Sequence, residues 1–340
     1  MKNKTNISRR DLFKAGLGAG AVMLCGGIPV RAQSQTKLVF MEPFDLALEY
    51  MHEMNAVVGG HFAKEGLDVT ISNARGTSIG IQQVIAGQAA ATRIGLLDLM
   101  QADSKQTTPL VSVATSLQEG IFSLISLKSA PITNAAAMKG KTIGVASMGG
   151  GMENTLNLLL AAGGVPKADV PRQAIGSNAG NIELLKQGRV AGFFATVENT
   201  AFLKRQGEPI VVWSATDVAP MPGGVIPVTK DFIDKNPDTV LKFVRALRNS
   251  ARECLSADPG MILDRITKKY ELEGNSDRAF RIDVIKAYNE MTVAAGKENI
   301  MRNVPSVFEG GAALVTKAGI VNVADAKALY TNKFVDEAAK

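Results

Sequence analysis

The chain has 340 residues, a formal net charge of +6 and the composition of an ordinary globular protein, without a low-complexity tract. Almost all of the excess charge lies in residues 1–32, which hold six basic residues and one acidic residue, whereas the remainder holds 32 basic and 31 acidic residues. This near-neutral remainder excludes a broad basic surface for nucleic acid or for a membrane, and its length allows two lobes.

Residues 1–32 predict an export signal. A basic segment with adjacent arginines, Ser8–Lys14, precedes an apolar segment at 15–30, and Val30-Arg31-Ala32 resembles a site that is cleaved after Ala32. The pattern S-R-R-x-x-F-K resembles a twin-arginine signal. The apolar segment is shorter than the roughly 20 residues of a membrane-spanning helix, so cleavage is favoured over a permanent anchor and the mature chain is expected in the periplasm.

The chain has two cysteines. Cys25 lies in the predicted signal, where a lipid anchor is an alternative, although Leu24 departs from the small residue that precedes a lipidated cysteine. Cleavage would leave Cys254 alone, so no internal disulfide could form. Because Cys254 lies in an apolar helical run, we expect it to be a small buried side chain.

Strand-like and helix-like segments alternate along the mature chain. Apolar and β-branched runs predict strands, and residues with a spacing of three and four, such as Ile81, Val84 and Ile85, predict helices. The predicted strands lie at 37–40, 67–72, 91–96, 110–116, 121–127, 142–146, 173–176, 190–196 and 210–214, and the clearest helices at 45–62, 77–86, 182–187 and 197–206. This alternation predicts an α/β fold with largely parallel sheets.

The chain after Lys230 has a helical pattern, and the simplest layout returns this C-terminal tail to the first lobe. Two extended apolar segments, near 121–127 and 221–228, bracket the second set of strands, and two extended crossings are what a hinge between lobes requires. The predicted first lobe is therefore 34–124 with 226–340, and the predicted second lobe is 125–225.

The turn Ser147-Met148-Gly149-Gly150-Gly151 joins a predicted strand to a predicted helix. Backbone N–H groups at a helix N-terminus lack partners inside the helix and lie at the positive end of its dipole, and glycines let a ligand approach them. An oxyanion or polar head group would fit this turn. The alternative is a tight turn in which Ser147 only caps the helix. No lysine follows in the spacing of a phosphate-binding loop.

Other candidate ligand contacts also follow strands, because ligands of open α/β sheets lie beyond the carboxyl ends of the strands. Gly76, Thr77 and Ser78 begin the helix after strand 67–72, although each hydroxyl alone would more often be a helix cap. The remaining candidates lie at the ends of other predicted strands or at the second crossing: Phe44, Leu97, Asp98, Thr196, Glu198 and Met221.

No catalytic, cofactor or metal motif accompanies these turns. The two histidines, His52 and His61, have no acid or cysteine at metal-ligand spacing, and no nucleophile motif of a hydrolase is present. We therefore expect no catalytic residue, no cofactor and no metal. Scattered carboxylates such as Glu153, Glu198 and Asp98 show no pairing in the sequence.

Four segments resemble the successive motifs of periplasmic solute-binding proteins of the nitrate/sulfonate/taurine type, also called the SsuA/THI5-like group. They read HFAKEGLDVTI, GTSIGIQQVIAGQAAATRIG, MKGKTIGVASMGGGMENTLNLLLAAGGV and NIELLKQGRVAGFFATVENTAFL, and the resemblance covers residues 36–330. It implies a two-lobed periplasmic-binding-protein fold of type II, with first-lobe contacts at residues 76–78 and second-lobe contacts at 147–151, Thr196 and Glu198. The acid usual after residue 89 is missing, and Arg93 stands nearby.

The resemblance implies a binding protein that delivers a small molecule to an ABC-type permease in the inner membrane, as a monomer without nucleic-acid partners. Two alternatives stay open: an enzyme resembling the thiamine-pyrimidine synthases, and a sensory protein that presents its ligand to a receptor. The amide-rich turns with Arg75 and Arg93 favour a carboxylate or sulfonate ligand. The carboxylates of Glu153, Glu198 and Asp98 would instead accept an amine or a hydroxylated heterocycle.

Overall fold

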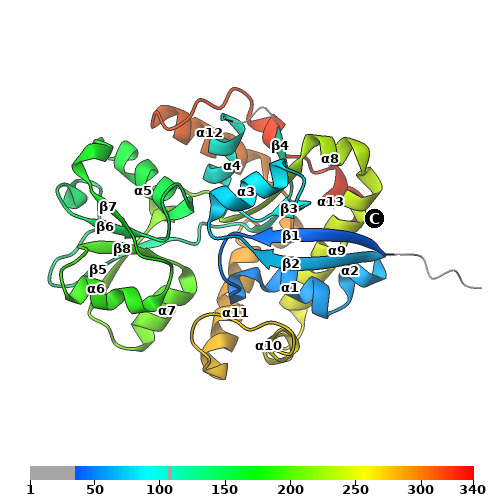
Figure 1. The fold of residues 1–340 in the computed structure, drawn as a ribbon, viewed down its shortest axis with the longest axis horizontal. Helices are drawn as coiled ribbons and strands as arrows, with labels where there is room; N and C mark the ends of the chain where they lie inside the picture. Colours follow the sequence, from blue (N-terminus) through cyan, green and yellow to red (C-terminus); the bar gives the residue numbers. More distant parts are fainter. Residues whose placement is uncertain (1–34, 106–108) are drawn as a thin grey trace, which may run out of the picture. The chain divides into compact units, whose positions relative to one another are not determined.

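The computed structural model describes residues 35–105 and 109–340, so the predicted export signal lies outside the described residues. Residues 35–340 form an α/β structure whose helices lie around three sheets (Figure 1). Within the described ranges, no helix is both long enough and apolar enough to cross a membrane.

The first lobe contains a three-stranded parallel sheet in the order β2-β1-β3. Strand β1 (Thr36–Glu42) lies between β2 (Leu67–Asn73) and β3 (Ala91–Thr92), and Phe40 pairs with both Ile71 and Ala91. The helices that follow these strands are α1 (Met51–Val58), α2 (His61–Lys64), α3 (Thr77–Ile85) and α4 (Leu96–Asp103). The carboxyl ends of parallel strands meet at one edge, so the turns after β1, β2 and β3 lie close together.

The second lobe is a five-stranded sheet in the order β7-β6-β8-β5-β9 (Figure 1). Its strands are β5 (Ser123–Leu127), β6 (Ile143–Val145), β7 (Arg172–Ala174), β8 (Gly192–Ala195) and β9 (Ile210–Ser214), and its helices are α5 (Gly151–Ala162), α6 (Ile182–Lys186) and α7 (Val197–Arg205). Strand β6 is parallel to both β7 and β8, whereas β5 is antiparallel to both β8 and β9.

The chain passes between the lobes twice. It leaves the first lobe after β4 (Leu110–Leu117) and returns through β10 (Gly224–Thr229), and these two strands pair antiparallel. The two connecting segments are bonded to each other, because the N–H of Gly223 donates to the carbonyl of Glu119 at 2.8 Å. The lobe bounds and the hinge that the sequence suggests near 121–127 and 221–228 stay predictions.

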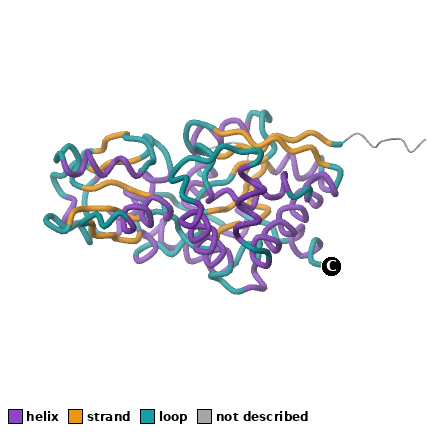
Figure 2. Tube along the Cα trace, turned by 90° about the horizontal axis from the view of Figure 1, so that it is seen from below, coloured by secondary structure: helices purple, strands orange, loops and turns teal. Residues whose placement is uncertain are grey.

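The C-terminal helices lie around the first lobe (Figure 1). Figure 2 shows helices, in purple, beside the strands, in orange. They are α8 (Lys230–Lys235), α9 (Pro237–Ser256), α10 (Pro259–Thr267), α11 (Arg278–Thr292), α12 (Pro305–Lys317) and α13 (Lys333–Glu337). In α9, Phe243 stacks on Phe40 of β1 and on Phe62 of α2, with ring centroids 5.8 and 5.4 Å apart. Burial of these rings attaches the tail to the first sheet.

Short 3-10 helices complete the described structure: η1 (Leu48–Tyr50), η2 (Ala136–Met138), η3 (Lys167–Asp169), η4 (Ala179–Asn181), η5 (Ala215–Asp217), η6 (Lys297–Asn299) and η7 (Ala326–Leu329). The predicted α/β class is confirmed. The sheets are more mixed than expected, because the strands that carry the chain between the lobes, β4, β5 and β10, all pair antiparallel.

Two predicted elements are wrong in part. The expected helix at 45–62 is divided into η1, α1 and α2, because the chain turns at Gly59-Gly60, where Gly60 has a φ of 73°. The expected strand at 91–96 ends at Thr92, and helix α4 begins at Leu96, where no helix is expected from the sequence. Nearly every side chain of α4 is buried, so the segment lacks the one-sided pattern that reveals a helix.

Candidate functional site

Two glycine-containing turns begin helices in opposite lobes. Gly76 caps α3 with a φ of 130°, and Gly149 precedes α5 with a φ of 70°; side chains are disfavoured at both angles. The turns are partly satisfied within the protein, since the N–H of Gly149 donates to Oε2 of Glu153 at 2.5 Å. The predicted cradle of free amides is therefore already occupied in part by the chain's own carboxylate.

The two turns also contact each other across the lobes. Ser78 Oγ donates to the carbonyl of Gly149 at 2.7 Å, and Asn154 Nδ2 of α5 donates to Oδ1 of Asp98 in α4 at 2.6 Å. A Cβ added to Gly151 would lie 2.9 Å from the other oxygen of Asp98, so glycine permits this close approach. We call these four residues (Ser78, Asp98, Gly149 and Asn154) the turn contact.

Asp98 is the ionisable group of the turn contact. Its side chain is buried, and burial raises its pKa to about 6, although the hydrogen bond from Asn154 opposes that increase. The Asn154 amide therefore compensates a carboxylate that has lost most of its hydration. A cavity of about 160 Å³ lies beside this contact and includes Thr77, Lys105 and Gln101.

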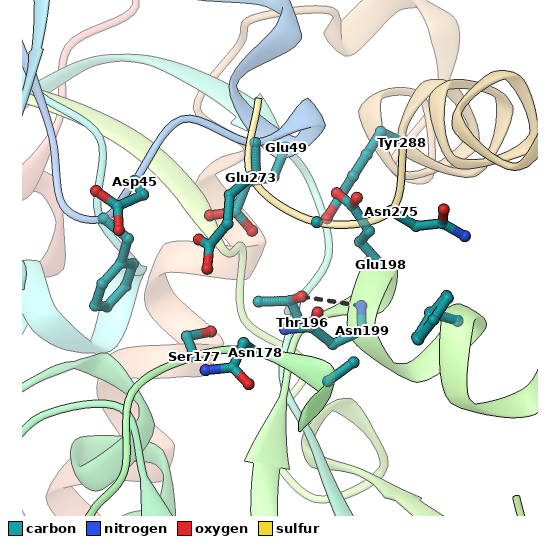
Figure 3. A pocket seen from close by; sticks show the side chains of 15 residues that line it. Asp45, Glu49, Ser177, Asn178, Thr196, Glu198, Asn199, Glu273, Asn275 and Tyr288 are labelled. Atoms are coloured by element: carbon teal, nitrogen blue, oxygen red, sulfur yellow. Dashed lines mark hydrogen bonds between the residues drawn. The ribbon is translucent and has the colours of Figure 1, made fainter. Parts of the chain in front are cut away.

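A larger cavity of about 270 Å³ also has walls from both lobes. The first lobe and its C-terminal helices contribute Phe44, Asp45, Ala47, Glu49, Glu273, Gly274, Asn275 and Tyr288, and the second lobe contributes Ser177, Asn178, Ala179, Thr196, Glu198, Asn199 and Phe202. Figure 3 shows Asp45, Glu49 and Glu273 on one side of this space and Ser177, Asn178 and Thr196 on the opposite side. We call it the acidic cavity.

Four carboxylates line the acidic cavity: Asp45, Glu49, Glu198 and Glu273. Among the residues that the structure describes, no lysine, arginine or histidine lines it. Glu198 is 5% exposed, and among the described residues neither of its oxygens has a hydrogen-bond partner. Burial, together with the nearby Glu49 carboxylate, raises the pKa of Glu198 to about 7. Unpartnered buried carboxylates are costly, and both oxygens of Glu198 can accept a hydrogen bond from a donor in the cavity.

Arg93 lies beneath the cavity and holds Glu49. The Arg93 side chain is 2% exposed, its Nη2 lies 3.4 Å from Oε1 of Glu49, and its guanidinium stands 4.6 Å from the ring centroid of Tyr50. Burial lowers the pKa of Arg93, but the facing carboxylates, Glu49 first, raise it by more. Arg93 therefore stays charged and fixes Glu49 at the cavity wall.

Two further carboxyls surround Arg93 without lining the cavity. Burial, with mutual repulsion, raises the pKa of Glu42 well above its usual range, and burial raises the pKa of Glu53. His52 beside them is fully buried, and burial lowers its pKa to about 3, so its ring is neutral. Arg93, the arginine noted in the sequence, thus belongs to a buried charge cluster below the cavity.

The candidates from the sequence lie in three places. Phe44, Thr196 and Glu198 line the acidic cavity; Thr77, Ser78, Asp98 and Gly149 line the smaller cavity; and Leu97, Met221 and again Asp98 line a space of about 50 Å³ near the second crossing. Gly76, Ser147, Met148, Gly150 and Gly151 line none of these three spaces, and Met148 is exposed. Thr196 also caps α7, accepting from the N–H of Asn199 at 3.3 Å.

Several residues of the acidic cavity are absent from the sequence-based candidates. Ser177 and Asn178 follow β7, so the rule that ligands lie beyond strand ends points to them as well. Glu273 and Asn275 come from the loop between α10 and α11, and Glu49 from a 3-10 helix, so no strand end indicates them. Their place in the cavity depends on tertiary packing of the C-terminal helices.

The described residues offer no group of three His, Cys, Asp or Glu side chains arranged for a metal ion. Cys254 is fully buried, and burial raises the pKa of its thiol, so it is not available as a thiolate nucleophile. His61 is paired with Glu253 at 2.8 Å, away from the acidic cavity.

A family model described as NMT1/THI5 like matches residues 49–260. The riboflavin-binding protein RibY of Chloroflexus aurantiacus is 27% identical over 246 residues, which cover 69% of each chain. The family match includes strands of both lobes and helix α9.

Two solved structures show the same fold. The periplasmic nitrate-binding protein NrtA from Synechocystis PCC 6803 has a TM-score of 0.67 and 15% identity, over 90% of this chain and 88% of that one. The alkanesulfonate-binding protein SsuA from Xanthomonas axonopodis pv. citri, bound to MOPS, has a TM-score of 0.61 and 13% identity, over 90% and 97%. The architecture is the two-lobed fold of periplasmic binding proteins.

Proposed function

The chain belongs to the NMT1/THI5-like family, and from that premise we propose that it is the extracytoplasmic binding component of an ABC-type importer. It traps a small polar organic molecule between its lobes and delivers it to a permease in the inner membrane. The observation that carries this proposal is the acidic cavity of about 270 Å³, whose walls come from both lobes. A ligand that contacts both walls favours the closed arrangement of the lobes.

Export of the chain is part of the proposal. The basic segment with paired arginines, the apolar segment and the cleavage pattern before Gln33 support transport across the inner membrane in the folded state. The nitrate-binding relative in structure is periplasmic. A mature chain released in that compartment would meet both its solute and the outer face of a permease.

The acidic cavity disfavours the carboxylate or sulfonate ligand that the amide-rich turns suggest. Four carboxylates line it, without a basic side chain from the described part of the chain, and an anion there would meet like charges at low dielectric. The structural relatives bind nitrate and alkanesulfonate, and the relative in sequence binds riboflavin. We propose that this chain binds a molecule that donates hydrogen bonds, as the alternative from Glu198 and Asp98 anticipates.

No observation favours an enzyme over a binding protein. The thiol of Cys254 and the ring of His52 are both buried outside the cavity, and a synthase that depends on cysteine and histidine would need them at the ligand. A sensory protein that presents its ligand to a receptor would use the same cavity. Deletion of the permease distinguishes the two roles, because import of the ligand must stop if the chain serves the transporter.

The proposed function is tested with the purified mature chain. The chain is incubated with a polar small-molecule extract, washed and unfolded, and the released compounds are identified by mass spectrometry. Small-angle scattering before and after the incubation measures closure. A released compound together with a smaller radius of gyration is the expected result. A chain that releases no compound and keeps its radius of gyration would contradict the proposal.

A further inference from the structure

The geometry points to a small organic cation as the ligand, with its protonated nitrogen held between Glu49 of the first lobe and Glu198 of the second. This inference rests on the proposed function and adds the charge of the solute and the two residues that select it. The chemical class is a protonated amine or amidine on a compact apolar or aromatic body. A neutral heterocycle, an anion and a metal ion are the competing occupants.

The charge of the cavity wall favours a positively charged ligand. Its four carboxylates face a space of about 270 Å³ that no basic side chain of residues 35–105 or 109–340 lines. A neutral donor would satisfy the geometry of one or two carboxylate oxygens but would leave their mutual repulsion. A positive charge offsets the repulsion and donates hydrogen bonds to the same oxygens.

Glu198 supplies the unsatisfied acceptor of the second lobe. Its side chain is 95% buried in the packed structure, and both carboxylate oxygens lack a partner among the described residues. The site is narrow, because a Cβ added to Gly274 in the facing loop would lie 2.7 Å from Oε1 of Glu198. The carboxylate is therefore confined at the cavity wall.

Burial is the main reason that Glu198 retains a proton, and the groups that face it add to or oppose this effect. Glu49 of η1 and Glu273 of the loop before α11 repel its negative charge. Arg281 of α11 and the backbone amide of Leu48 favour the charged form, and Tyr288 adjoins the cavity. Arg281 itself does not line the cavity; its guanidinium donates to the carbonyls of Asn275 and Leu272. With a pKa of about 7, Glu198 is protonated in part near neutral pH, and a cationic ligand would displace that proton.

Glu49 supplies the acceptor of the first lobe. It is 5% exposed; Arg93 lies 3.4 Å from its Oε1, while Oε2 has no hydrogen-bond partner in the described part of the chain. Arg93 is thus a positioning residue that holds Oε1 of Glu49 and leaves Oε2 available. Because Glu49 and Glu198 belong to different lobes, a nitrogen between them would couple charge recognition to closure.

Aromatic side chains complete the site. Phe44, Phe202 and Tyr288 line the cavity with the four carboxylates. Ring faces attract a desolvated cation and pack against an apolar body. The amides of Asn178, Asn199 and Asn275 can orient further polar groups of the ligand.

Three probes of matched size test the charge of the ligand: benzylammonium, benzyl alcohol and benzoate. Isothermal titration calorimetry with the mature chain is expected to give an affinity for benzylammonium at least about 10-fold above that for benzyl alcohol, and no binding of benzoate. Glu198→Gln should weaken benzylammonium at least about 10-fold. Glu290→Gln, the same change on the exposed face of α11, should leave its affinity unchanged.

A proton readout separates recognition from folding. Below about pH 7 the binding of benzylammonium should release a proton from Glu198, so the heat should depend on the ionisation enthalpy of the buffer. Glu198→Gln should remove that dependence, and circular dichroism confirms that this variant is folded. Glu198 carries the test because Glu49 also pairs with Arg93 in the folded chain.

Other outcomes overturn the inference. Equal or tighter binding of benzyl alcohol or benzoate would do so, as would binding of Ca²⁺ without any binding of benzylammonium, or failure of all the probes at millimolar concentration. The proposed function fails in a different way, through the absence of any released compound in the extract experiment. A released compound that is anionic or neutral would preserve the function and reject the cation.

Discussion

The turn contact and the acidic cavity both lie between the lobes, but their polar groups are satisfied differently. In the turn contact, Ser78 and Asn154 each donate to a partner in the opposite lobe, at 2.7 and 2.6 Å. In the acidic cavity, Glu198 has no partner for either oxygen and Glu49 lacks one for Oε2. The first region holds the lobes together through the protein's own groups, whereas the second leaves acceptors for a ligand.

The glycine-rich turn that stands out in the sequence is therefore the less available of the two regions for a ligand. A glycine-rich turn after a strand indicates exposed amides, yet Gly149 donates to Glu153 and accepts from Ser78. The buried carboxylate of Glu198 has the greater need of a hydrogen-bond partner, and no local sequence motif predicts this. Substitutions in either region should change stability, lobe closure or ligand binding.

The largest expected effect follows removal of the cation beneath the acidic cavity. Arg93→Ala would leave Glu49 and the buried carboxyls of Glu42 and Glu53 without a positive partner, which should lower the free energy of unfolding by about 3–5 kcal/mol. Urea unfolding measures it, with Arg189→Ala on the surface as the control. A loss no greater than that of the control would show that Arg93 does not hold this region.

The second effect is the pH dependence that Glu198 introduces. The pKa of Glu198 is about 7 in the folded chain and 4.5 ordinarily. Between pH 4.5 and pH 7 the folded chain therefore binds more protons than the unfolded chain. Its free energy of unfolding falls as the pH rises through this range. The total loss should be at most about 3 kcal/mol. The free energy of unfolding is measured against pH for the wild type and for Glu198→Gln, and the difference between the two curves gives the contribution of Glu198. Parallel curves would show that Glu198 does not cause the pH dependence.

The third prediction concerns the buried acid of the turn contact. Asn154→Ala removes the donor to Asp98 and should cost about 1–3 kcal/mol, because the carboxylate stays buried without that hydrogen bond. The variant should also shift scattering in the absence of ligand towards a larger radius of gyration. Asn322→Ala, on an exposed residue, is the control; identical stabilities for the two variants would exclude a role for the turn contact.

The smallest expected effect follows loss of a single hydroxyl. Ser78→Ala removes the hydrogen bond to the Gly149 carbonyl and should cost about 1 kcal/mol. Ser256→Ala removes a bond of the same type within α9, so it should change stability without changing lobe closure. Scattering that responds equally to both variants would mean that the Ser78 bond does not link the lobes.

The sequence predicts the sheet framework well, because apolar runs after turns define β1, β2, β4 and β9 within one or two residues. It fails where burial hides periodicity, as in α4, and where paired glycines divide a helix, as at Gly59-Gly60. The family resemblance is confirmed by the match over residues 49–260.

The site is predicted less completely than the fold. Phe44, Thr196 and Glu198 follow from their places after strands, and all three line the acidic cavity. Glu273 and Tyr288 lie more than 70 residues further along the chain than Glu198, on the helical tail. Packing of that tail against α7, where the ring centroids of Phe202 and Phe280 are 5.9 Å apart, brings them to the cavity, and no local pattern encodes that contact.

Closure of the lobes on a cation is tested most directly by a distance between them. Spin labels are attached at Glu309→Cys in α12 and at Lys167→Cys in η3, because both positions are exposed. Cys254 is fully buried, so it stays unlabelled. Double electron–electron resonance should give a shorter and narrower distance distribution at saturation with benzylammonium, and no change with benzoate. Bound benzylammonium with an unchanged distribution would contradict the account.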